Sequence, residues 1–426
     1  MSHKKQWFKL DNAAKIYPPA QTRNRTSMFR LSTTLKDKVD TNILKSALEK
    51  TLNRFPSFAC RLKRGFFWYY LEHIDGTPPI LPDVKNPMTH LNMKKNRNFM
   101  FRVRCYHGRI ALEFFHVLTD ASGGMTFLLT LVSEYVRLKY GVSASVGGYI
   151  LNIDDKPEPC EYEDSFLRYA KKERLPRNEE AAYHPSFTPL PLHQLLLTSG
   201  TLPTDVLISK AKEYNVTVTV FLTAILIEAI ANLQKNERSA SKRKDPVKVS
   251  VPVNLRRFFE SKTLRNFSSY LNPGIDTRFG DFTFEEILVQ VRSLLDSRAN
   301  KKYLNARFSE NVAMERNIFV RLVPLFIKKP VLRFFFTRQG DAYISSTLSN
   351  MGVINVPEEL TEYIERLDFL LGQSFTLLPV CACLSYNGKT VLNFSRTYAE
   401  PDIEREFFTL LIKHGIPVYI ESNGRC

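Results

Sequence analysis

His116 and Asp120 lie four residues apart at the end of an alternating segment, and both side chains suit acid–base chemistry. Apolar residues at positions 110, 112 and 114 alternate with Arg109, Ala111 and Glu113, which is the period of a half-buried strand. His116 keeps the phase of the apolar positions, so we expect its imidazole to point to the buried side where the strand ends. A neutral imidazole near pH 7 is the usual general base for an alcohol, an amine or a thiol.

The residues that follow Asp120 predict a tight turn and then a helix. Ala-Ser-Gly-Gly at 121–124 can reverse the chain, and apolar residues between Met125 and Val136 recur at helical spacing. We expect Ser122 to cap this helix, since no Gly-x-Ser-x-Gly segment surrounds it that would make it a nucleophile. A histidine and an aspartate at this spacing are more often packing residues than a catalytic pair, so the rest of the chain has to decide.

The composition indicates a globular, basic protein. The 426 residues are 44% apolar and 12% aromatic, which suits two or three domains, or two similar halves, with sizeable cores. The formal net charge of +17 suits a solvated basic surface, an anionic small ligand, an anionic membrane face or a nucleic acid. No helix-turn-helix, zinc-finger or RNA-binding aromatic motif accompanies the charge, so we do not expect a nucleic-acid partner.

The cysteines and the apolar runs point to a cytoplasmic protein. None of the six cysteines forms a CxxC pair, and Cys381 and Cys383 share one face of an expected strand. We expect reduced thiols and no zinc site. The N-terminus has no apolar signal region, and no uninterrupted apolar run reaches transmembrane length.

The chain divides into two expected halves that join through a proline-rich stretch. Residues 1–175 form the first half, 176–200 the crossover and 201–426 the second half. Both halves mix helices with hairpin-connected strands, so the predicted fold class is α/β. No strand leads into a Gly-rich phosphate loop, which argues against a dinucleotide fold or a P-loop.

Local signals place the elements within the halves. One expected helix starts after Asp40, and the others run over 206–214, from about 219 to 233, over 284–304 and over 403–413. The expected hairpins turn at 63–65, His107–Gly108 and Asn387–Gly388. The apolar segment from Asn317 to Arg338 also carries lysines and arginines. We expect it to be buried in the second half, and the alternative is a lid or a contact with an anionic membrane surface.

Several separated pieces of the chain resemble one family. They are Leu44-x-x-Ala47-Leu48 with Arg54-Phe55-Pro56, the stretch from Phe115 to Gly124, Val251 to Arg256, Arg265-Asn266-Phe267, Leu348 to Gly352 and the C-terminal strand, hairpin and helix. In this order and spacing the chain resembles the CoA-dependent acyltransferase superfamily. That superfamily includes chloramphenicol acetyltransferase, alcohol acetyltransferases and condensation domains. The bacterial alcohol-acetyltransferase-like branch is the most similar.

The resemblance implies two similar halves, each with a mixed, mostly antiparallel sheet and helices, and a tunnel between them. His116 would be the general base that takes a proton from the acceptor as the acceptor attacks a thioester carbonyl. Asp120 would support the loop that carries His116, in a pair with Arg256. Acyl-CoA would be the co-substrate, with no permanently bound cofactor and no metal.

The resemblance also implies substrate contacts, with alternatives for each. Gly123 and Gly124 would lie at the substrate, although Ala121 stands where the family often has glycine. Asn266 could line the tunnel or be a turn amide. Asn350 could help hold the oxyanion or form an Asn-x-Gly turn.

Three functions stay open at this point. The first is transfer from acyl-CoA to a hydroxyl or amine acceptor, which could be a small alcohol or lipid-like. The second is a condensation-type module that takes its donor from a carrier protein. The third is a binding module that has the fold without turnover. A peripheral membrane position is the alternative to a purely cytoplasmic one.

Overall fold

The computed structural model describes residues 6–21, 25–176, 178–237, 239, 244–335, 341–372 and 378–424. Predictions that involve Phe336, Arg338, Cys426 and the start of the strand expected from Phe375 therefore lie outside the described residues.

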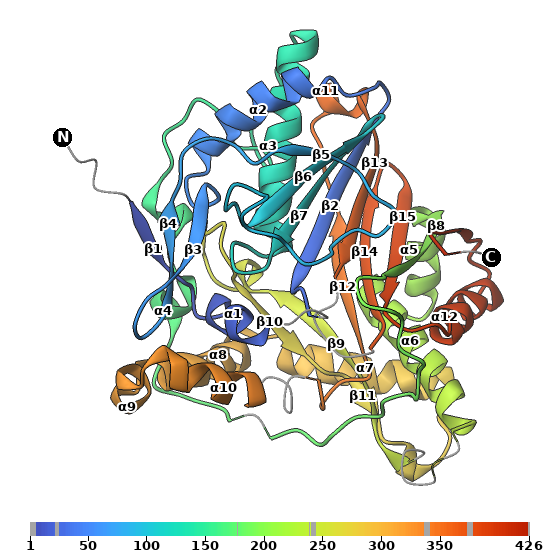
Figure 1. Cartoon of the computed structure of the whole chain (residues 1–426). Coiled ribbons are helices and arrows are strands. Elements are labelled where there is room, and N and C mark those ends of the chain that lie inside the picture. Colours follow the sequence, from blue (N-terminus) through green and yellow to red (C-terminus); the bar gives the residue numbers. More distant parts are fainter. Residues whose placement is uncertain are drawn as a thin grey trace.

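The first half is built on a five-stranded sheet with the order β13-β2-β7-β6-β5. Helices α2 and α3 pack together behind this sheet (Figure 1). A small sheet, β1-β4-β3, lies beside it. The bounds are β1 (Trp7–Lys9), β2 (Met28–Leu35), α2 (Thr41–Arg54), β3 (Cys60–Arg64), β4 (Tyr69–His73), β5 (Ile80–Pro82), β6 (Phe101–Tyr106), β7 (Arg109–Phe115), α3 (Ala121–Tyr140) and β13 (Ile364–Leu371).

The second half is built on an eight-stranded sheet with the order β10-β9-β12-β14-β15-β8-β16, in which β11 also pairs with β9. Helix α6 packs against α7, α12 and β9. The strand bounds are β8 (Leu196–Pro203), β9 (Val247–Asn254), β10 (Ser268–Leu271), β11 (Gly274–Ile275), β12 (Ser346–Val353), β14 (Val380–Tyr386), β15 (Lys389–Arg396) and β16 (Tyr419–Ser422). The helix bounds are α5 (Thr204–Glu213), α6 (Val218–Lys235), α7 (Phe284–Arg298) and α12 (Asp402–Lys413).

Shorter elements connect these layers. They are η1 (Ala14–Ile16), α1 (Tyr17–Ala20), η2 (Pro159–Glu161), α4 (Ser165–Tyr169), η4 (Leu255–Arg257), η5 (Thr277–Phe279), α8 (Lys301–Arg316), α9 (Ile318–Leu322), α10 (Leu325–Phe335) and α11 (Glu358–Thr361).

Strand β14 joins the two cores because successive side chains leave a strand on opposite faces. Ala382 and Leu384 belong to the core of the first half, whereas Cys381 and Cys383 belong to the core of the second half. The expected common face of the two cysteines is therefore present. Burial raises the pKa of both thiols, that of Cys383 to about 12.

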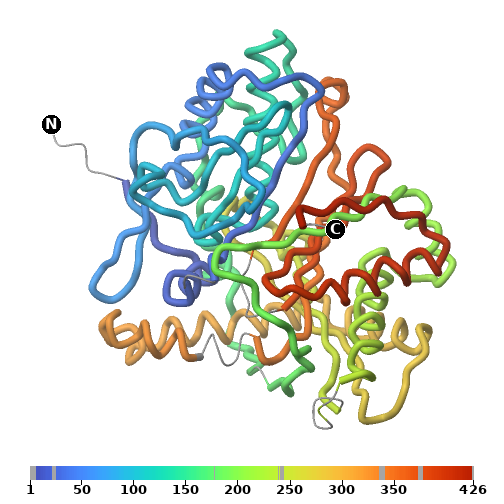
Figure 2. The backbone as a smooth tube through the Cα atoms, turned by 45° about the vertical axis from the view of Figure 1, so that its right-hand side comes forward, coloured from blue at the N-terminus to red at the C-terminus, as the bar shows by residue number. Residues whose placement is uncertain are grey.

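The topology crosses the predicted boundaries in two places. Strand β13, at residues 364–371, lies in the predicted second half but pairs antiparallel with β2 of the first sheet. Strand β8 begins at Leu196, inside the stretch predicted as a crossover, and pairs with β15 and β16. Figure 2 shows the green crossover chain running along the surface past both halves toward the C-terminal strand. Hydrophobic pattern reports the face of a strand but not the sheet that it joins.

Most local turn and cap signals act as expected. Asp40 caps α2 by accepting hydrogen bonds from the backbone N–H groups of Asn42 and Ile43. Gly141 ends α3 with φ of 75°. Asn387 and Gly388 have φ of 47° and 73° and connect β14 to β15, as an Asn-Gly hairpin requires.

Strand β7 is not half-buried, and the prediction from its alternating pattern is wrong there. Glu113, on the more polar face, has no exposed surface. Its carboxylate lies 2.6 Å from Arg102 Nη2 and 3.2 Å from Arg30 Nη1. Arginine partners make burial of this carboxylate tolerable, so a charged residue occupies an interior position.

The single helix predicted over residues 284–304 is two helices. Helix α7 ends at Arg298, and α8 begins at Lys301 with Asn300 as its N-cap. The Asn300 side chain accepts a hydrogen bond from the N–H of Tyr303. An asparagine that caps a helix offers the backbone an alternative to continued helix, which explains the break.

Among the described residues, α6 is the one helix that is long and apolar enough to cross a membrane. It contains Glu228, and 67% of its 18 residues are buried inside the protein. In this structure α6 is the central helix of the second core.

The expected burial of the segment from Asn317 is wrong for its described part. Phe319 is 80% exposed and Phe326 is 59% exposed, whereas Leu325 is buried. Apolar composition alone does not tell which face of a short helix finds a partner.

Candidate active site

His116 lies directly after β7, between two aromatic rings. Its backbone N–H donates to the carbonyl of Ser27 at 2.9 Å. The ring of Tyr17, the first residue of α1, stacks on the imidazole with centroids 4.7 Å apart and planes 14° apart. Phe29 of β2 meets the imidazole edge-on at 5.1 Å. The aromatic rings fix the plane of the half-buried imidazole and keep water from much of its surface.

Asn266 determines which nitrogen of His116 carries the proton. Its Nδ2 donates to the His116 carbonyl at 3.0 Å and to Asp11 Oδ2 at 3.1 Å. Because both of these partners are acceptors, the amide must present Oδ1 to His116 Nδ1, at 2.9 Å. An acceptor at Nδ1 requires that Nδ1 carries the hydrogen. The lone pair is therefore on Nε2, as a general base needs.

Asp11 and Arg265 hold Asn266 from behind. Asp11 is fully buried, accepts from the Ala14 N–H at 2.7 Å and lies 3.4 Å from Arg265 Nη2. Burial raises the pKa of Asp11, and the charge of Arg265 partly opposes this. Neither Asp11 nor Tyr17 was identified from the sequence, since Asp11 stands outside any motif and its contact with Asn266 spans 255 residues.

The environment keeps the imidazole neutral near pH 7. Burial lowers the pKa of His116 below its ordinary 6.5, while the hydrogen bond that His116 Nδ1 donates to Asn266 and the charge of Asp120 act in the opposite direction. A neutral imidazole with a lone pair on Nε2 can accept a proton from a hydroxyl or an amine.

Asp120 links the loop of His116 to the second half of the chain. Its Oδ2 accepts from Arg256 Nη1 at 2.8 Å and from the Phe267 N–H at 2.9 Å. Arg256 also donates from Nε to the Thr263 carbonyl at 2.9 Å and from Nη2 to the Arg265 carbonyl at 2.5 Å. The pairing of Asp120 with Arg256 expected from the sequence is present. It holds the loop against residues 263–267.

The N-cap of α3 is Asp120 and not Ser122, so that expectation is wrong. Asp120 Oδ1 accepts from the Gly123 N–H at 3.1 Å. Ser122 Oγ instead accepts from Asn254 Nδ2 at 3.0 Å. Aspartate is as good an N-cap as serine, and Asp120 directly precedes the first helical residue, whereas Ser122 lies inside the helix.

Gly123 and Gly124 pack tightly at the start of α3. A Cβ on Gly123 would lie 2.1 Å from the Leu264 carbonyl oxygen, and a Cβ on Gly124 would lie 3.0 Å from the Phe29 ring. Absence of a side chain therefore lets α3 approach both the second half and the first sheet. Their contact with substrate stays a prediction.

Asn350 lies within β12, which continues to Val353, at a point where the pairing with β14 shifts register and Gly352 has φ of 76°. Its Nδ2 donates to Thr219 Oγ1 at 3.1 Å and its Oδ1 accepts from the Gly352 N–H at 2.8 Å. The amide is thus oriented by partners at the start of α6 and in its own strand. Its role toward an oxyanion stays a prediction, as does the tunnel.

In the described part of the chain, no three His, Cys, Asp or Glu side chains are grouped as ligands for a metal ion. The groups that the structure brings together at His116 are an amide, two carboxylates, two guanidinium groups and aromatic rings.

Comparison with known proteins finds similarity at the level of structure. No protein-family model matches the chain, and no curated protein matches it. The structure of polyketide synthase associated protein 5 from Mycobacterium tuberculosis is similar, with 15% identity, a TM-score of 0.61 and coverage of 95% of this chain and 96% of that chain.

Two further solved structures have the same arrangement. Trichothecene 15-O-acetyltransferase from Fusarium sporotrichioides has 11% identity and a TM-score of 0.61, over 97% of this chain and 95% of that chain. A mutant starter condensation domain of rhizomide synthetase, in complex with C8-CoA, has 13% identity and a TM-score of 0.62, over 96% and 95%. The chain therefore has the α/β fold that CoA-dependent acyltransferases share with condensation domains.

Proposed function

We propose that the protein is an acyltransferase that moves an acyl group from a thioester to a hydroxyl or amine acceptor, with His116 as the general base. The observation that carries the proposal is the orientation of His116 by Asn266, which leaves the lone pair on Nε2. A fold shared with acyltransferases and condensation domains supports it.

The reaction balances with His116 alone as the proton carrier. Nε2 takes the proton from the acceptor hydroxyl or amine as its oxygen or nitrogen bonds to the thioester carbonyl carbon. The resulting tetrahedral intermediate collapses, and the C–S bond breaks. The imidazolium returns its proton to the departing sulfur, so a free thiol leaves and the base is regenerated.

The two alternatives for this reaction differ in the acyl donor. The complex of the rhizomide starter condensation domain with C8-CoA favours acyl-CoA as donor. Similarity to the condensation domain of a polyketide synthase favours a carrier-bound thioester. The acetyltransferase among the similar structures favours a hydroxyl acceptor. We take acyl-CoA and a hydroxyl as the first pair to test, with Gly123, Gly124 and Asn350 as the predicted substrate contacts. Asn266 was also predicted as a substrate contact, and in this proposal it acts through His116, to which its amide is bonded.

The experiment measures thiol release from acetyl-CoA and longer acyl-CoAs against a panel of alcohols and amines. We expect acceptor-dependent release by the wild-type protein and its loss in a folded His116→Ala variant. His90→Ala, which changes an exposed histidine, should keep the wild-type rate. If His116→Ala matches the wild type with CoA donors and again with acyl-carrier donors, the proposal is wrong and a binding role for the fold takes its place.

A further inference from the structure

Apolar side chains exposed to solvent are concentrated on α9, α10 and the turn between β3 and β4. Phe319 is 80% exposed, Phe66 67% and Leu322 63%. We call these exposed side chains together the α9–α10 patch. Its exposed apolar members are Phe66, Phe67, Ile318, Phe319, Val320, Leu322, Phe326, Ile327 and Val331. Clusters of exposed apolar side chains mark surfaces that bind a protein partner, a ligand or a membrane.

The patch is held in place by contacts between its two segments. The Leu325 N–H donates to the Phe66 carbonyl at 2.8 Å, and Lys328 Nζ donates to the Phe67 carbonyl at 3.2 Å. The Lys328 ammonium also lies 3.8 Å from the centre of the Trp68 ring. Figure 1 shows α9 and α10 below the small sheet of β1, β3 and β4. Apolar side chains thus project from a surface whose backbone is already fixed.

The charge around the patch has one sign. Between residues 316 and 335 the sequence has five basic residues and no acidic residue. The basic residues are Arg316, Arg321, Lys328, Lys329 and Arg333. Lys328 is buried against Trp68, and the other four are exposed. Exposed cations beside exposed apolar side chains complement a surface that is anionic outside and apolar inside.

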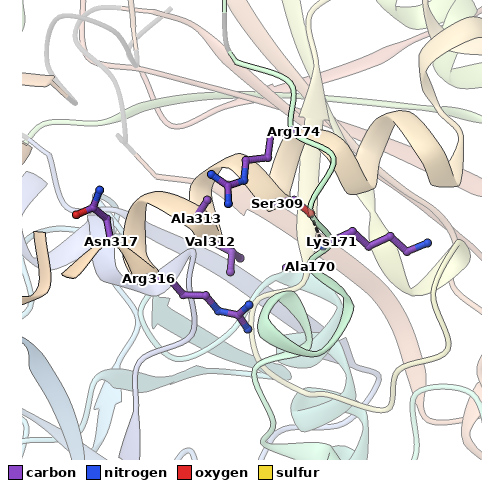
Figure 3. A pocket seen from close by; sticks show the side chains of 8 residues that line it. All are labelled: Ala170, Lys171, Arg174, Ser309, Val312, Ala313, Arg316 and Asn317. Carbon is purple, nitrogen blue, oxygen red and sulfur yellow. Dashed lines mark hydrogen bonds between the residues drawn. The ribbon is translucent and has the colours of Figure 1, made fainter. Parts of the chain in front are cut away.

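A basic pocket of about 310 Å³ adjoins the patch where α8 passes into α9. Lys171, Arg174 and Arg316 line it, together with Ser309 and Asn317. In Figure 3 Arg174 and Arg316 lie on either side of the α8 backbone at Val312 and Ala313. Within the described residues, Lys171 and Arg174 have no carboxylate partner within ion-pair distance. The pocket suits the phosphate of a headgroup beside the apolar face.

We propose that the α9–α10 patch docks the protein on an anionic lipid surface. Phe319, Leu322 and Phe326 enter the boundary between headgroups and acyl chains, and Arg321 and Arg333 meet the headgroups. A lipid phosphate binds at Arg174 in the adjoining pocket, and Lys171 and Arg316 add positive charge to the pocket lining. A bilayer can accommodate projecting apolar side chains of any shape, whereas a protein partner would need a groove that is complementary to them. The projecting side chains therefore favour a bilayer over an acidic carrier protein.

The patch is close to the candidate active site in the fold. Helix α10 packs against α1, whose first residue, Tyr17, stacks on the ring of His116. Docking through the patch would place the bilayer next to the candidate active site. If the proposed acyltransferase function holds, on which this step rests, the acceptor is a hydroxyl group of a lipid.

Vesicle flotation tests the docking without relying on catalysis. We expect the wild-type protein to float with vesicles of phosphatidylcholine and phosphatidylglycerol, and to bind pure phosphatidylcholine at least tenfold more weakly, because each basic residue adds about 1 kcal/mol at an anionic surface. Phe319→Ser with Phe326→Ser should lower binding by about tenfold or more. The control Phe279→Ser changes a phenylalanine that is 82% exposed on η5, and it should bind as the wild type does.

The role of the basic pocket is tested by reversing the charge of one of its arginines, and the control reverses the charge of an arginine elsewhere on the surface. Arg174→Glu should weaken flotation with the anionic vesicles about tenfold, whereas Arg292→Glu on the exposed face of α7 should leave it unchanged. Absence of flotation at low salt, or equal losses in the patch and control variants, overturns the proposal. Turnover of a short soluble acceptor, measured on the same variants, reports the proposed function separately, and patch variants should keep it.

Discussion

His116 Nδ1 lies 2.9 Å from Asn266 Oδ1, and this one contact gives the two ring nitrogens different chemistry. Asn266 cannot turn its amide over without losing its bonds to the His116 carbonyl and to Asp11. The protein thus fixes the tautomer of its candidate base with a neutral side chain. A carboxylate in this position would hold the imidazolium more strongly and raise the pKa of His116.

Replacement of Asn266 by alanine tests this arrangement. We expect Asn266→Ala to lower kcat by about 10- to 100-fold with little change in KM, since a positioned base contributes about 10²- to 10⁴-fold. Because the hydrogen bond that His116 Nδ1 donates to Asn266 raises the pKa of His116, its loss should also move the acid limb of the pH–rate profile to lower pH. Asn232→Ala, which removes an amide bonded to Glu406 on α12, is the control and should leave both readouts unchanged. An unchanged kcat in Asn266→Ala would contradict the positioning role.

The pH dependence of the wild-type reaction follows from the burial of His116. A general base works only when deprotonated, so kcat/KM should fall as the pH drops through the pKa of His116. Burial places that pKa below 6.5, and we expect the rate to be nearly constant from pH 8 to 7 and to decline only below 6.5. Steady-state rates with one acyl-CoA and one acceptor across pH 5 to 8 give the inflection. An inflection above 6.5 would show that the partners of His116 outweigh its burial.

Arg256→Ala should destabilise the protein more than it weakens ligand binding. It leaves Asp120, which is 5% exposed, with a hydrogen bond from Phe267 but without its cation, and such a loss commonly costs about 3–5 kcal/mol. Urea unfolding followed by circular dichroism measures the change. Asp120→Asn with Arg256→Ala should cost less than the sum of the two single changes, because the pair is coupled. A stable but inactive Arg256→Ala protein would instead place the arginine in catalysis.

Gly123 and Gly124, near the start of α3, should differ in their tolerance of a methyl group. Alanine is the better helix former by about 1 kcal/mol, which acts equally at both positions. At Gly123 the added Cβ meets the Leu264 carbonyl at 2.1 Å, a backbone atom that cannot move alone, so Gly123→Ala should lose at least about 2 kcal/mol. At Gly124 the neighbours are side chains at 3.0 to 3.2 Å, so Gly124→Ala should stay within about 1 kcal/mol of the wild type. Equal unfolding midpoints for the two variants would contradict this packing.

The sequence predicts those parts of the site that depend on short-range signals. The strand that ends at His116, the glycines after Asp120 and the strand that leads to Arg256 each have a local pattern, and the fold expected from the resemblance is confirmed. Asp11 and Tyr17 belong to no local sequence pattern. They come close to His116 only because the first twenty residues pack against the second half of the chain. The exposure of Phe319 was missed for a related reason: apolar character predicts that a residue seeks a partner, not that the partner is part of the same chain.

Strand β13 has a consequence for the order in which the protein can be made. Strand β2 at residues 28–35 has β7 on one side and β13, at residues 364–371, on the other. During synthesis the ribosome releases β2 more than three hundred residues before its second neighbour, so one edge of the first sheet stays open meanwhile. The N-terminal half is therefore completed only when the C-terminal half is nearly finished, and nascent chains that stop near the crossover expose an unpaired edge to chaperones and to one another.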